Sequence, residues 1–103
     1  MAERTLIDLA IAPSGELLVR GEIDLQTGPA LQQALDEVIR SGTGDVVVDL
    51  SGVEFMDSAG LNVLVRAVKQ LIEQDRCLVL HAPTPAVRRI LTLGGADTFV
   101  RYA

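Results

Sequence analysis

Cysteine, histidine and tryptophan are scarce in this chain of 103 residues, which has one cysteine, one histidine and no tryptophan. Cys77 cannot form a disulfide within the chain, and because it opens the apolar run 77–80 it is predicted to be a small buried hydrophobe. One cysteine and one histidine are too few ligands for a zinc site, so no metal ion and no other cofactor is expected. His81, at the end of a predicted strand, is interpreted as a solvated or structural imidazole rather than a catalytic base.

Positively charged residues are outnumbered, because 9 Lys and Arg stand against 14 Asp and Glu, for a formal net charge of -5. Nucleic acids bind proteins largely through Lys and Arg, so no direct nucleic-acid partner is expected. The same balance does not favour an anionic membrane surface, and no apolar run approaches the roughly 18 residues of a membrane span. Residues 1–5 lack the basic start and the apolar run of a secretory signal. We therefore expect a cytoplasmic protein with no membrane contact.

Catalytic motifs are missing as well. Ser58 lies in a Met-Asp-Ser-Ala-Gly run, where methionine replaces the first glycine of the G-x-S-x-G nucleophile motif. The glycine-rich loops that hold nucleotide phosphates do not occur. Asp49 resembles the phosphoacceptor of a receiver domain only weakly, because a receiver's acidic pair and lysine are absent, and it is interpreted as a strand-end or loop-bonding residue. We expect no enzymatic activity and no small-molecule substrate.

Hydrophobic periodicity divides the chain into strands and helices. Segments 6–11 and 16–21 are strand-like and flank a turn that contains Pro13 and Gly15, which predicts a hairpin. Three segments carry apolar residues at helical spacing after a capping residue or an early proline, and they are 27–41, 57–75 and 84–93. Three further strands are predicted at 45–50, 77–81 and 98–102. The predicted order is β-β-α-β-α-β-α-β.

This order of elements predicts an α/β fold with a mixed, mostly parallel sheet. The valine run 46–48 has no polar alternation, which is typical of a central strand covered on both faces. Each strand-helix-strand unit requires a right-handed crossover, so the later strands are expected to be parallel, with helices packed on the sheet. The N-terminal hairpin then supplies an antiparallel strand. No repeat or linker interrupts residues 1–103, which we expect to form a single domain.

The segment 49–61 joins the predicted central strand to a helix. Loops at the carboxyl ends of parallel strands are the usual binding edge of such sheets. The helix end is expected to offer unpaired N–H groups and a partial positive charge, which would tolerate a phosphate on the Ser58 oxygen. Ala59 and Gly60 leave room for a partner to approach. The alternative is that Asp57 or Ser58 is only a helix N-cap, worth about 1 kcal/mol.

The run 49–61 closely resembles the phosphorylation-site signature of STAS-domain anti-sigma factor antagonists. Residues 21–24 and the helix start at Thr27 resemble that family's other characteristic stretch, and the order of elements matches over essentially the whole chain. The resemblance implies a STAS-like domain in a bacterial partner-switching cycle. The unmodified protein binds an anti-sigma factor that is also a serine kinase and thereby frees a sigma factor; the kinase phosphorylates the antagonist, and a serine phosphatase resets it.

The resemblance also implies roles for individual residues, with Ser58 as the phosphoacceptor. The implied partner-binding positions are Asp24, Asp57, Ser58, Ala59, Gly60 and Leu61. Asn62 stands where a small or apolar residue is commoner in the family, so it is expected to affect partner choice. Further phosphosites at Ser51, Thr84 and Thr92 are left open. The alternative function is that of a constitutive STAS subunit of another complex, such as a lipid transporter, with no phosphorylation cycle.

Overall fold

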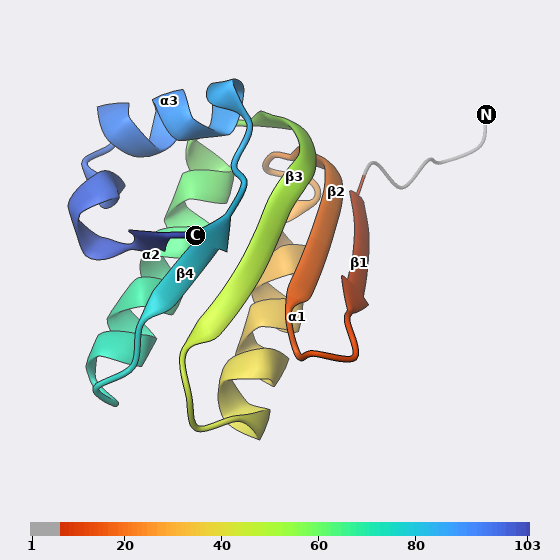
Figure 1. The fold of residues 1–103 in the computed structure, drawn as a ribbon. Coiled ribbons are helices and arrows are strands. Elements are labelled where there is room, and N and C mark those ends of the chain that lie inside the picture. The colour runs from red at the N-terminus through yellow and green to blue at the C-terminus, as the bar shows by residue number, and fades with distance from the viewer. Residues whose placement is uncertain (1–6) are drawn as a thin grey trace.

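Five strands, three α-helices and one short 3-10 helix make up residues 7–103, the part of the chain that the computed structural model describes (Figure 1). In chain order they are β1 (Ile7–Ile11), β2 (Leu17–Ile23), α1 (Gly28–Ser41), β3 (Val46–Met56), α2 (Ser58–Ile72), β4 (Leu78–His81), α3 (Pro85–Leu93), η1 (Ala96–Phe99) and β5 (Arg101–Tyr102). Leu6, which was predicted to open the first strand, lies outside the described residues. The three predicted helices are confirmed.

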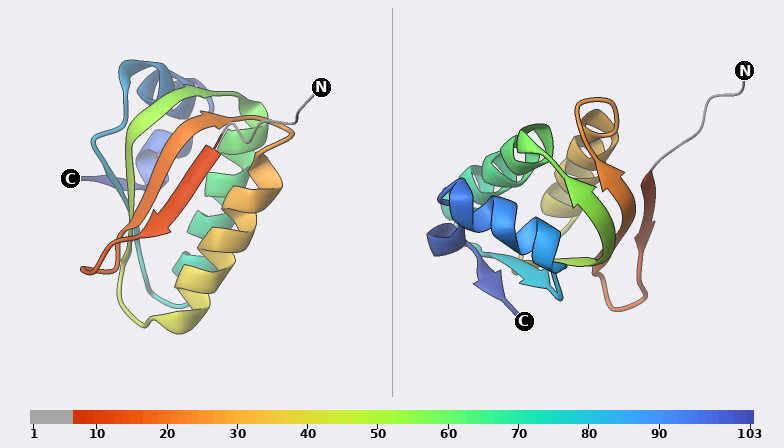
Figure 2. Two further views of the ribbon diagram at one scale, coloured as in Figure 1. Left: turned by 90° about the vertical axis from the view of Figure 1, so that its right-hand side faces the viewer. Right: turned by 90° about the horizontal axis from the view of Figure 1, so that it is seen from above.

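The strands form one sheet in the order β1-β2-β3-β4-β5. β1 is antiparallel to β2, and the other three pairs are parallel, which confirms the predicted mixed sheet, the hairpin and the central place of β3. Because the spatial order of the strands follows the chain, successive right-handed crossovers put their helices on the same face. Figure 2 shows α1 and α2 side by side on that face.

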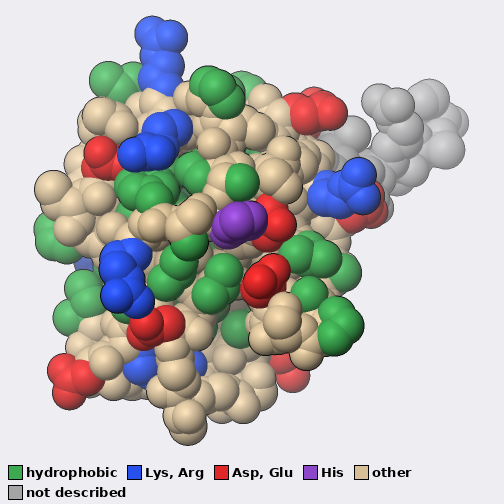
Figure 3. All heavy atoms as spheres, viewed as in Figure 1, with side chains coloured by type: hydrophobic (Ala, Val, Ile, Leu, Met, Phe, Trp, Pro, Cys, Tyr) green, Lys and Arg blue, Asp and Glu red, His purple; other side chains and the backbone are tan. Residues whose placement is uncertain are grey.

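Among residues 7–103 no helix covers the opposite face of the sheet, so the prediction that β3 is covered on both faces is wrong. Along β3, the buried Val46, Val48 and Leu50 alternate with the half-buried Val47 and Asp49. The open face, seen in Figure 3, carries hydrophobic side chains among side chains of both charges. Valine at position 47 satisfies strand propensity without being enclosed by a second layer.

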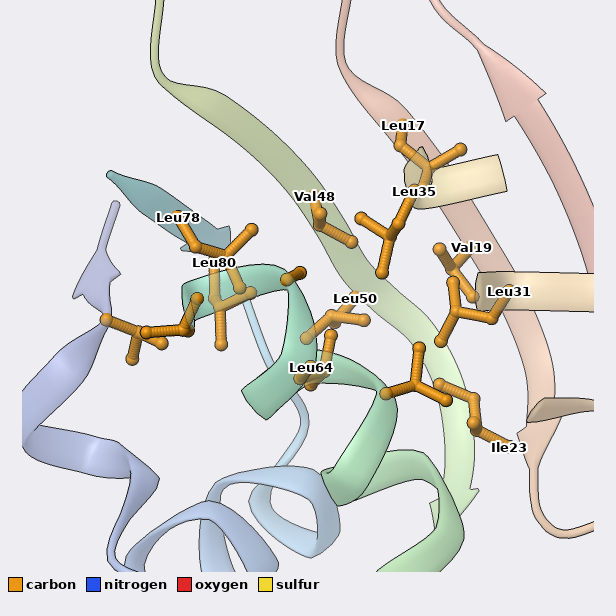
Figure 4. Close-up of a cluster of buried hydrophobic side chains, with 14 of the residues drawn as sticks. Leu17, Val19, Ile23, Leu31, Leu35, Val48, Leu50, Leu64, Leu78 and Leu80 are labelled. Carbon is orange, nitrogen blue, oxygen red and sulfur yellow. The ribbon is translucent and has the colours of Figure 1, made fainter. Parts of the chain in front are cut away.

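The core fills the space between the sheet and the helices. Leu31 and Leu35 of α1 and Leu64 of α2 are fully buried and lie close to the aliphatic side chains of β2, β3 and β4 (Figure 4). The largest fully buried side chains are Leu17, Ile23, Leu31, Leu35, Leu50, Leu64, Leu71, Leu78, Leu80, Leu91, Val19 and Val48. Burying one such side chain contributes about 1.5–3 kcal/mol. Leucine, isoleucine and valine therefore build this interior without aromatic residues.

β3 is longer than predicted, because residues 51–56 continue the strand instead of forming a connection. Its pairing with β2 shifts register between Leu18 and Arg20, and Arg20 lies opposite Gly52. A Cβ atom at Gly52 would lie 2.8 Å from Arg20 Cγ. Glycine at position 52 is therefore needed for close approach of the neighbouring strand at a bulge.

The C-terminal strand is shorter than predicted. Gly95 has a left-handed backbone with φ of 76° and introduces η1, so only Arg101 and Tyr102 pair with β4. The β-branched and aromatic residues at 98–100 indicated a strand by propensity alone. Local turn geometry after α3 overrides that propensity here.

Arg76 is buried and fastens three segments at the end of the sheet away from α3. Its Nε donates to Gly44 O at 2.7 Å, and its Nη1 donates to Ile39 O at 2.9 Å and to Gln74 Oε1 at 2.6 Å. Ile39 lies in the last turn of α1, where a cation is also favoured by the helix dipole. The guanidinium therefore joins the end of α1 and the approach to β3 to the segment that follows α2.

Replacing this guanidinium with an apolar side chain should destabilise the fold. Arg76→Met is expected to lower the free energy of unfolding by about 2–3 kcal/mol, since hydrogen bonds from a charged donor are lost. Urea denaturation measures the change, with Arg40→Met as the control. Arg40 is exposed and its one ion pair is a surface pair with Glu37, so that control should change stability by less than about 0.5 kcal/mol. Equal effects of the two substitutions would contradict the role given to Arg76.

Candidate functional site

Two strand-helix connections lie next to each other at one end of the sheet. Ile23 and Met56 are the last register partners of β2 and β3. The residue after Met56, Asp57, donates its backbone N–H to Ile23 O at 3.1 Å. Asp24 follows Ile23 and Asp57 follows Met56, and these two preceding residues are paired across the sheet. The two aspartates, predicted to share a partner surface, therefore lie at neighbouring strand ends. In Figure 1 this end of the sheet is at the top of the molecule, near α3.

Asp57 is the N-cap of α2. Its backbone is extended, and its Oδ1 accepts from Ala59 N at 2.9 Å and from Gly60 N at 3.4 Å. Its carbonyl accepts from Leu61 N at 3.0 Å. Within the described chain, Ser58 N is the one amide of this first turn without a protein partner. The expectation of several unpaired N–H groups at this helix end is therefore wrong, because the Asp57 carboxylate has taken two of them.

Ser58 is the first residue of α2, and its side chain is exposed. Its hydroxyl forms no hydrogen bond with any residue in 7–103. Asp57, by contrast, is half-buried and fixed by its capping bonds. The two adjacent residues thus divide the roles that sequence analysis left open: Asp57 caps the helix, and Ser58 presents a hydroxyl to solvent.

Gly60 allows the start of α2 to approach the ends of β2 and β3. A Cβ atom there would lie 2.6 Å from both Ile23 Cγ2 and Met56 Cγ, closer than side-chain carbons pack. Gly60 is buried, so it acts in this structure as a packing residue beneath Ser58 rather than as an exposed contact. The small residue at position 60 therefore sets how closely the start of α2, with Ser58, packs on the core.

A methyl group at position 60 should therefore cost stability. Gly60→Ala is expected to lower the free energy of unfolding by about 1–3 kcal/mol, because Ile23 and Met56 must move to admit it. Gly44→Ala is the matched control, since a Cβ atom at Gly44 has no neighbour within 4 Å, and it should not destabilise. Thermal and urea unfolding compare the two variants. A Gly60→Ala protein as stable as the control would contradict the close packing.

Asp24 holds the loop between β2 and α1. Its Oδ1 accepts from Gln26 N at 2.9 Å and Thr27 N at 3.0 Å and lies 3.2 Å from Thr27 Oγ1. The buried Thr27 hydroxyl in turn donates to Glu22 O at 2.8 Å. The bond from Thr27 N–H is the largest cause that lowers the pKa of the Asp24 carboxyl below its ordinary value. The loop that these bonds shape leaves Leu25 82% exposed.

The lowered pKa of Asp24 predicts a pH dependence. The ionised carboxyl contributes stability above the pKa of the unfolded chain, and this contribution is lost as the pH falls through the lower folded pKa. Asp24→Asn should therefore destabilise the protein at about pH 6, and its difference from wild type should shrink at about pH 3. Urea denaturation at the two pH values measures this difference. A difference that does not change with pH would show that the ionised form is not favoured by the fold.

Leu61, the last of the predicted partner-binding residues, packs against the end of α3. It is half-buried, and its Cδ2 occupies the space that a side chain at Gly94 would need. Gly94 is the C-cap of α3. Leu61 therefore couples the start of α2 to the end of α3, a packing role that the sequence did not indicate.

Sequence analysis missed two further features around Ser58. Leu25 and Phe55 expose large hydrophobic side chains, and Phe55 is 47% exposed although it lies in a strand. A groove of about 600 Å³ also runs between α1 and α2, which we call the α1–α2 groove. Its lining residues are Leu25, Gly28, Pro29, Gln32, Ala59, Asn62, Val63, Val65, Arg66 and Lys69. Asn62 had been singled out by its departure from the family pattern, but only the fold could show the groove.

Other candidates lie apart from this site. Asp49 accepts from Ser51 N and Ser51 Oγ at 2.9 and 2.7 Å, and the hydroxyl bond is the largest cause that lowers its pKa. It lies within β3 rather than at a strand end, which corrects its expected position. Cys77 is half-buried rather than fully buried, whereas His81 is exposed as expected. Thr84 caps α3 and donates to Val53 O at 2.9 Å.

Residues 7–103 contain neither a cluster of metal-ligating side chains nor a membrane-spanning helix. These residues contain no group of three or more His, Cys, Asp and Glu side chains placed to hold a metal ion. Among the helices of the same residues, none has the length and apolar character needed to cross a membrane.

Comparison with known proteins identifies the family. A family model described as "Mlab, STAS domain" matches residues 9–101. The anti-sigma-B factor antagonist of Staphylococcus aureus (strain NCTC 8325 / PS 47) is 34% identical over 80 residues, which cover 78% of this chain and 74% of that protein. The anti-sigma-B factor antagonist of Staphylococcus epidermidis is 35% identical with the same coverage.

Solved structures agree with this assignment. An anti-sigma factor antagonist from Mycobacterium paratuberculosis superposes with a TM-score of 0.78 at 33% identity, over 93% of this chain and 82% of that one. The unphosphorylated form of the antagonist SpoIIAA shares the fold, with a TM-score of 0.70 at 22% identity, over 94% of this chain and 87% of that one. The chain belongs to the STAS-domain family of anti-sigma factor antagonists.

Proposed function

We propose that this protein is a phosphorylation-controlled antagonist whose unmodified form binds an anti-sigma factor with serine-kinase activity and so releases a sigma factor. Phosphorylation of Ser58 then blocks that binding. The observation that carries the proposal is the exposed, unbonded Ser58 hydroxyl at the first residue of α2, beside a fixed carboxylate, in a chain of the antagonist family. Ala59, Gly60 and Leu61 follow Ser58 in the first turn of α2, and Asp24 follows Ile23, whose carbonyl accepts from Asp57 N.

Charge supplies the switching free energy. A phosphate adds about -1.5 to -2 charges to the Ser58 oxygen. Asp57 Oδ1 already receives two amides of the first turn, so the phosphate meets a neighbouring carboxylate and finds only the Ser58 N–H unused. Repulsion and desolvation at the docking surface follow. A loss of about 3 kcal/mol in binding free energy would weaken the affinity more than a hundredfold.

The core is expected to stay unchanged during the cycle. Ser58 is exposed, whereas the residues of α2 that pack on the sheet are others, among them Leu64 and Leu71. Added charge at the helix start is also favoured by the helix dipole, which offsets part of the repulsion within the protein itself. A serine phosphatase would return the chain to its binding form, and the role is regulatory and cytoplasmic rather than catalytic.

A constitutive STAS subunit of another complex, such as a lipid transporter, is the second candidate. The observation that favours it is the family model, whose description is "Mlab, STAS domain" rather than the name of an antagonist. One fold serves both functions, so the fold does not choose between them. The two curated relatives named above, at 34% and 35% identity, are antagonists, which is why we place the switching function first.

Substitutions at Ser58 test the switch. Ser58→Ala should bind the anti-sigma factor kinase of the same genome like wild type and should resist inactivation by that kinase and ATP. Ser58→Asp should bind at least tenfold more weakly, since it adds one charge where phosphate adds about two. Titration calorimetry of the three proteins measures the affinities, and mass spectrometry of the intact protein measures phosphorylation. Stoichiometric phosphorylation of Ser58→Ala would show that another residue is the acceptor.

Affinity capture separates the two candidate functions. Tagged wild-type protein should retain an ATP-binding serine kinase, and less of it should be retained by Ser58→Asp. Retention of a transporter ATPase, equal for the two proteins, would instead favour the constitutive subunit.

A further inference from the structure

The α1–α2 groove differs in charge from the rest of the surface. We propose that it binds an acidic segment of the anti-sigma factor, as a second contact that begins beside Ser58. This inference rests on the proposed function and adds the chemistry of the partner. It assigns a binding role to Arg66 and Lys69, which lie on α2 beyond the segment that resembles the family signature.

Two cations and no carboxylate are among the lining residues of the groove. Four other surface hollows of residues 7–103 each include at least one Asp or Glu. Within the described chain, neither Arg66 nor Lys69 takes part in an ion pair, whereas Arg40, Arg88 and Arg101 do. On a protein of net charge -5, this groove is therefore an exception that complements an acidic partner.

The apolar part of the groove limits what kind of acidic partner fits. Val63 is buried and Val65 half-buried at its floor, and Leu25 stands at its edge with 82% of its surface exposed. A partner segment that carries apolar side chains on one face would remove this surface from water. A small inorganic anion would leave it uncovered, so the groove fits a protein segment better than a free ion.

Gln32 provides a hydrogen-bond acceptor without a donor. Its Nε2 donates to Asp36 Oδ1 at 2.9 Å, and that bond fixes which end of the amide is the oxygen. The Oε1 atom is buried and has no hydrogen-bond partner in the described chain. Because the oxygen has no exposed surface, a docked segment would bond to it only after the Gln32 side chain turns toward the groove, and that bond would relieve the cost of an unpaired buried oxygen.

The groove and the phosphorylation site are continuous. Ala59, next to Ser58, and Asn62 line the groove at one end, and Lys69 lines it further along α2. Lys69 lies eleven positions after Ser58 in α2, a distance of about 16 Å along the helix axis. A phosphate at Ser58 would lie at one end of a bound acidic segment and repel it. An acidic segment bound in the groove would therefore explain why negative charge at Ser58 weakens binding of the anti-sigma factor.

Charge reversal tests the inference. Arg66→Glu/Lys69→Glu should bind the anti-sigma factor kinase at least tenfold more weakly than wild type in 50 mM NaCl, and the neutral Arg66→Gln/Lys69→Gln should show an intermediate loss. The matched control, Arg20→Glu/Arg101→Glu, makes the same charge change on the open sheet face and should stay within twofold. Titration calorimetry in 50 and 300 mM NaCl should also show that the groove variant loses most of the salt dependence. Circular dichroism checks that each protein is folded.

The outcomes separate this inference from the proposed function. If the groove variants bind within twofold of wild type while Ser58→Asp binds weakly, the groove inference is overturned and the switch stands. If Ser58→Asp binds like wild type, the switch itself fails, and weak binding by the groove variants would still support an acidic partner segment. No binding by wild type would overturn both. Self-association or binding to vesicles of phosphatidylcholine and phosphatidylglycerol that is lost in Arg66→Glu/Lys69→Glu would assign the groove to another occupant.

Discussion

The hydrogen bond from Asp57 N to Ile23 O is the constraint on which the site depends. It closes the parallel pairing of β2 with β3 at the point where both strands end. Gly60 then lets the first turn of α2 rest on Ile23 and Met56, so the height of the helix start is set by the core. This junction determines the exposure of Ser58 and brings the Asp24 loop close to the start of α2. It also places the end of the α1–α2 groove that Ala59 lines.

Asp57 gives the junction its electrostatic character. As a cap it stabilises the helix start, and as a carboxylate it places a negative charge beside the hydroxyl that we propose is phosphorylated. A helix end with free amides would accommodate a phosphate easily, whereas this end has its amides largely occupied. Asp57 thus stabilises the fold as a cap, and its charge also makes binding of a partner to Ser58-phosphorylated protein less favourable. Arg66 and Lys69 lie further along α2, where positive charge favours the opposite kind of contact.

The helices, the mixed sheet and the strand-to-helix junction could be predicted because capping residues and apolar spacing are local signals. Three features could not. Residues 51–56 continue β3 past a bulge at Gly52 instead of forming a connection, the valine at position 47 faces an uncovered side of the sheet, and residues 98–99 form part of a 3-10 helix. Each depends on neighbours distant in the chain or on a turn geometry that propensity does not encode. For the same reason the sequence indicated Ser58 but not the groove, whose two walls come from different helices.

The central claim is that phosphate at Ser58 acts by local charge and leaves the fold in place. The most direct measurement is a comparison of amide NMR spectra of the unmodified and enzymatically phosphorylated protein, with the affinity of each for the anti-sigma factor measured on the same samples. The account predicts shifts confined to the start of α2 and the loop at Asp24, together with a loss of binding of more than a hundredfold. Shifts that spread through the buried strands, or phosphorylated protein that binds as tightly as unmodified protein, would contradict it.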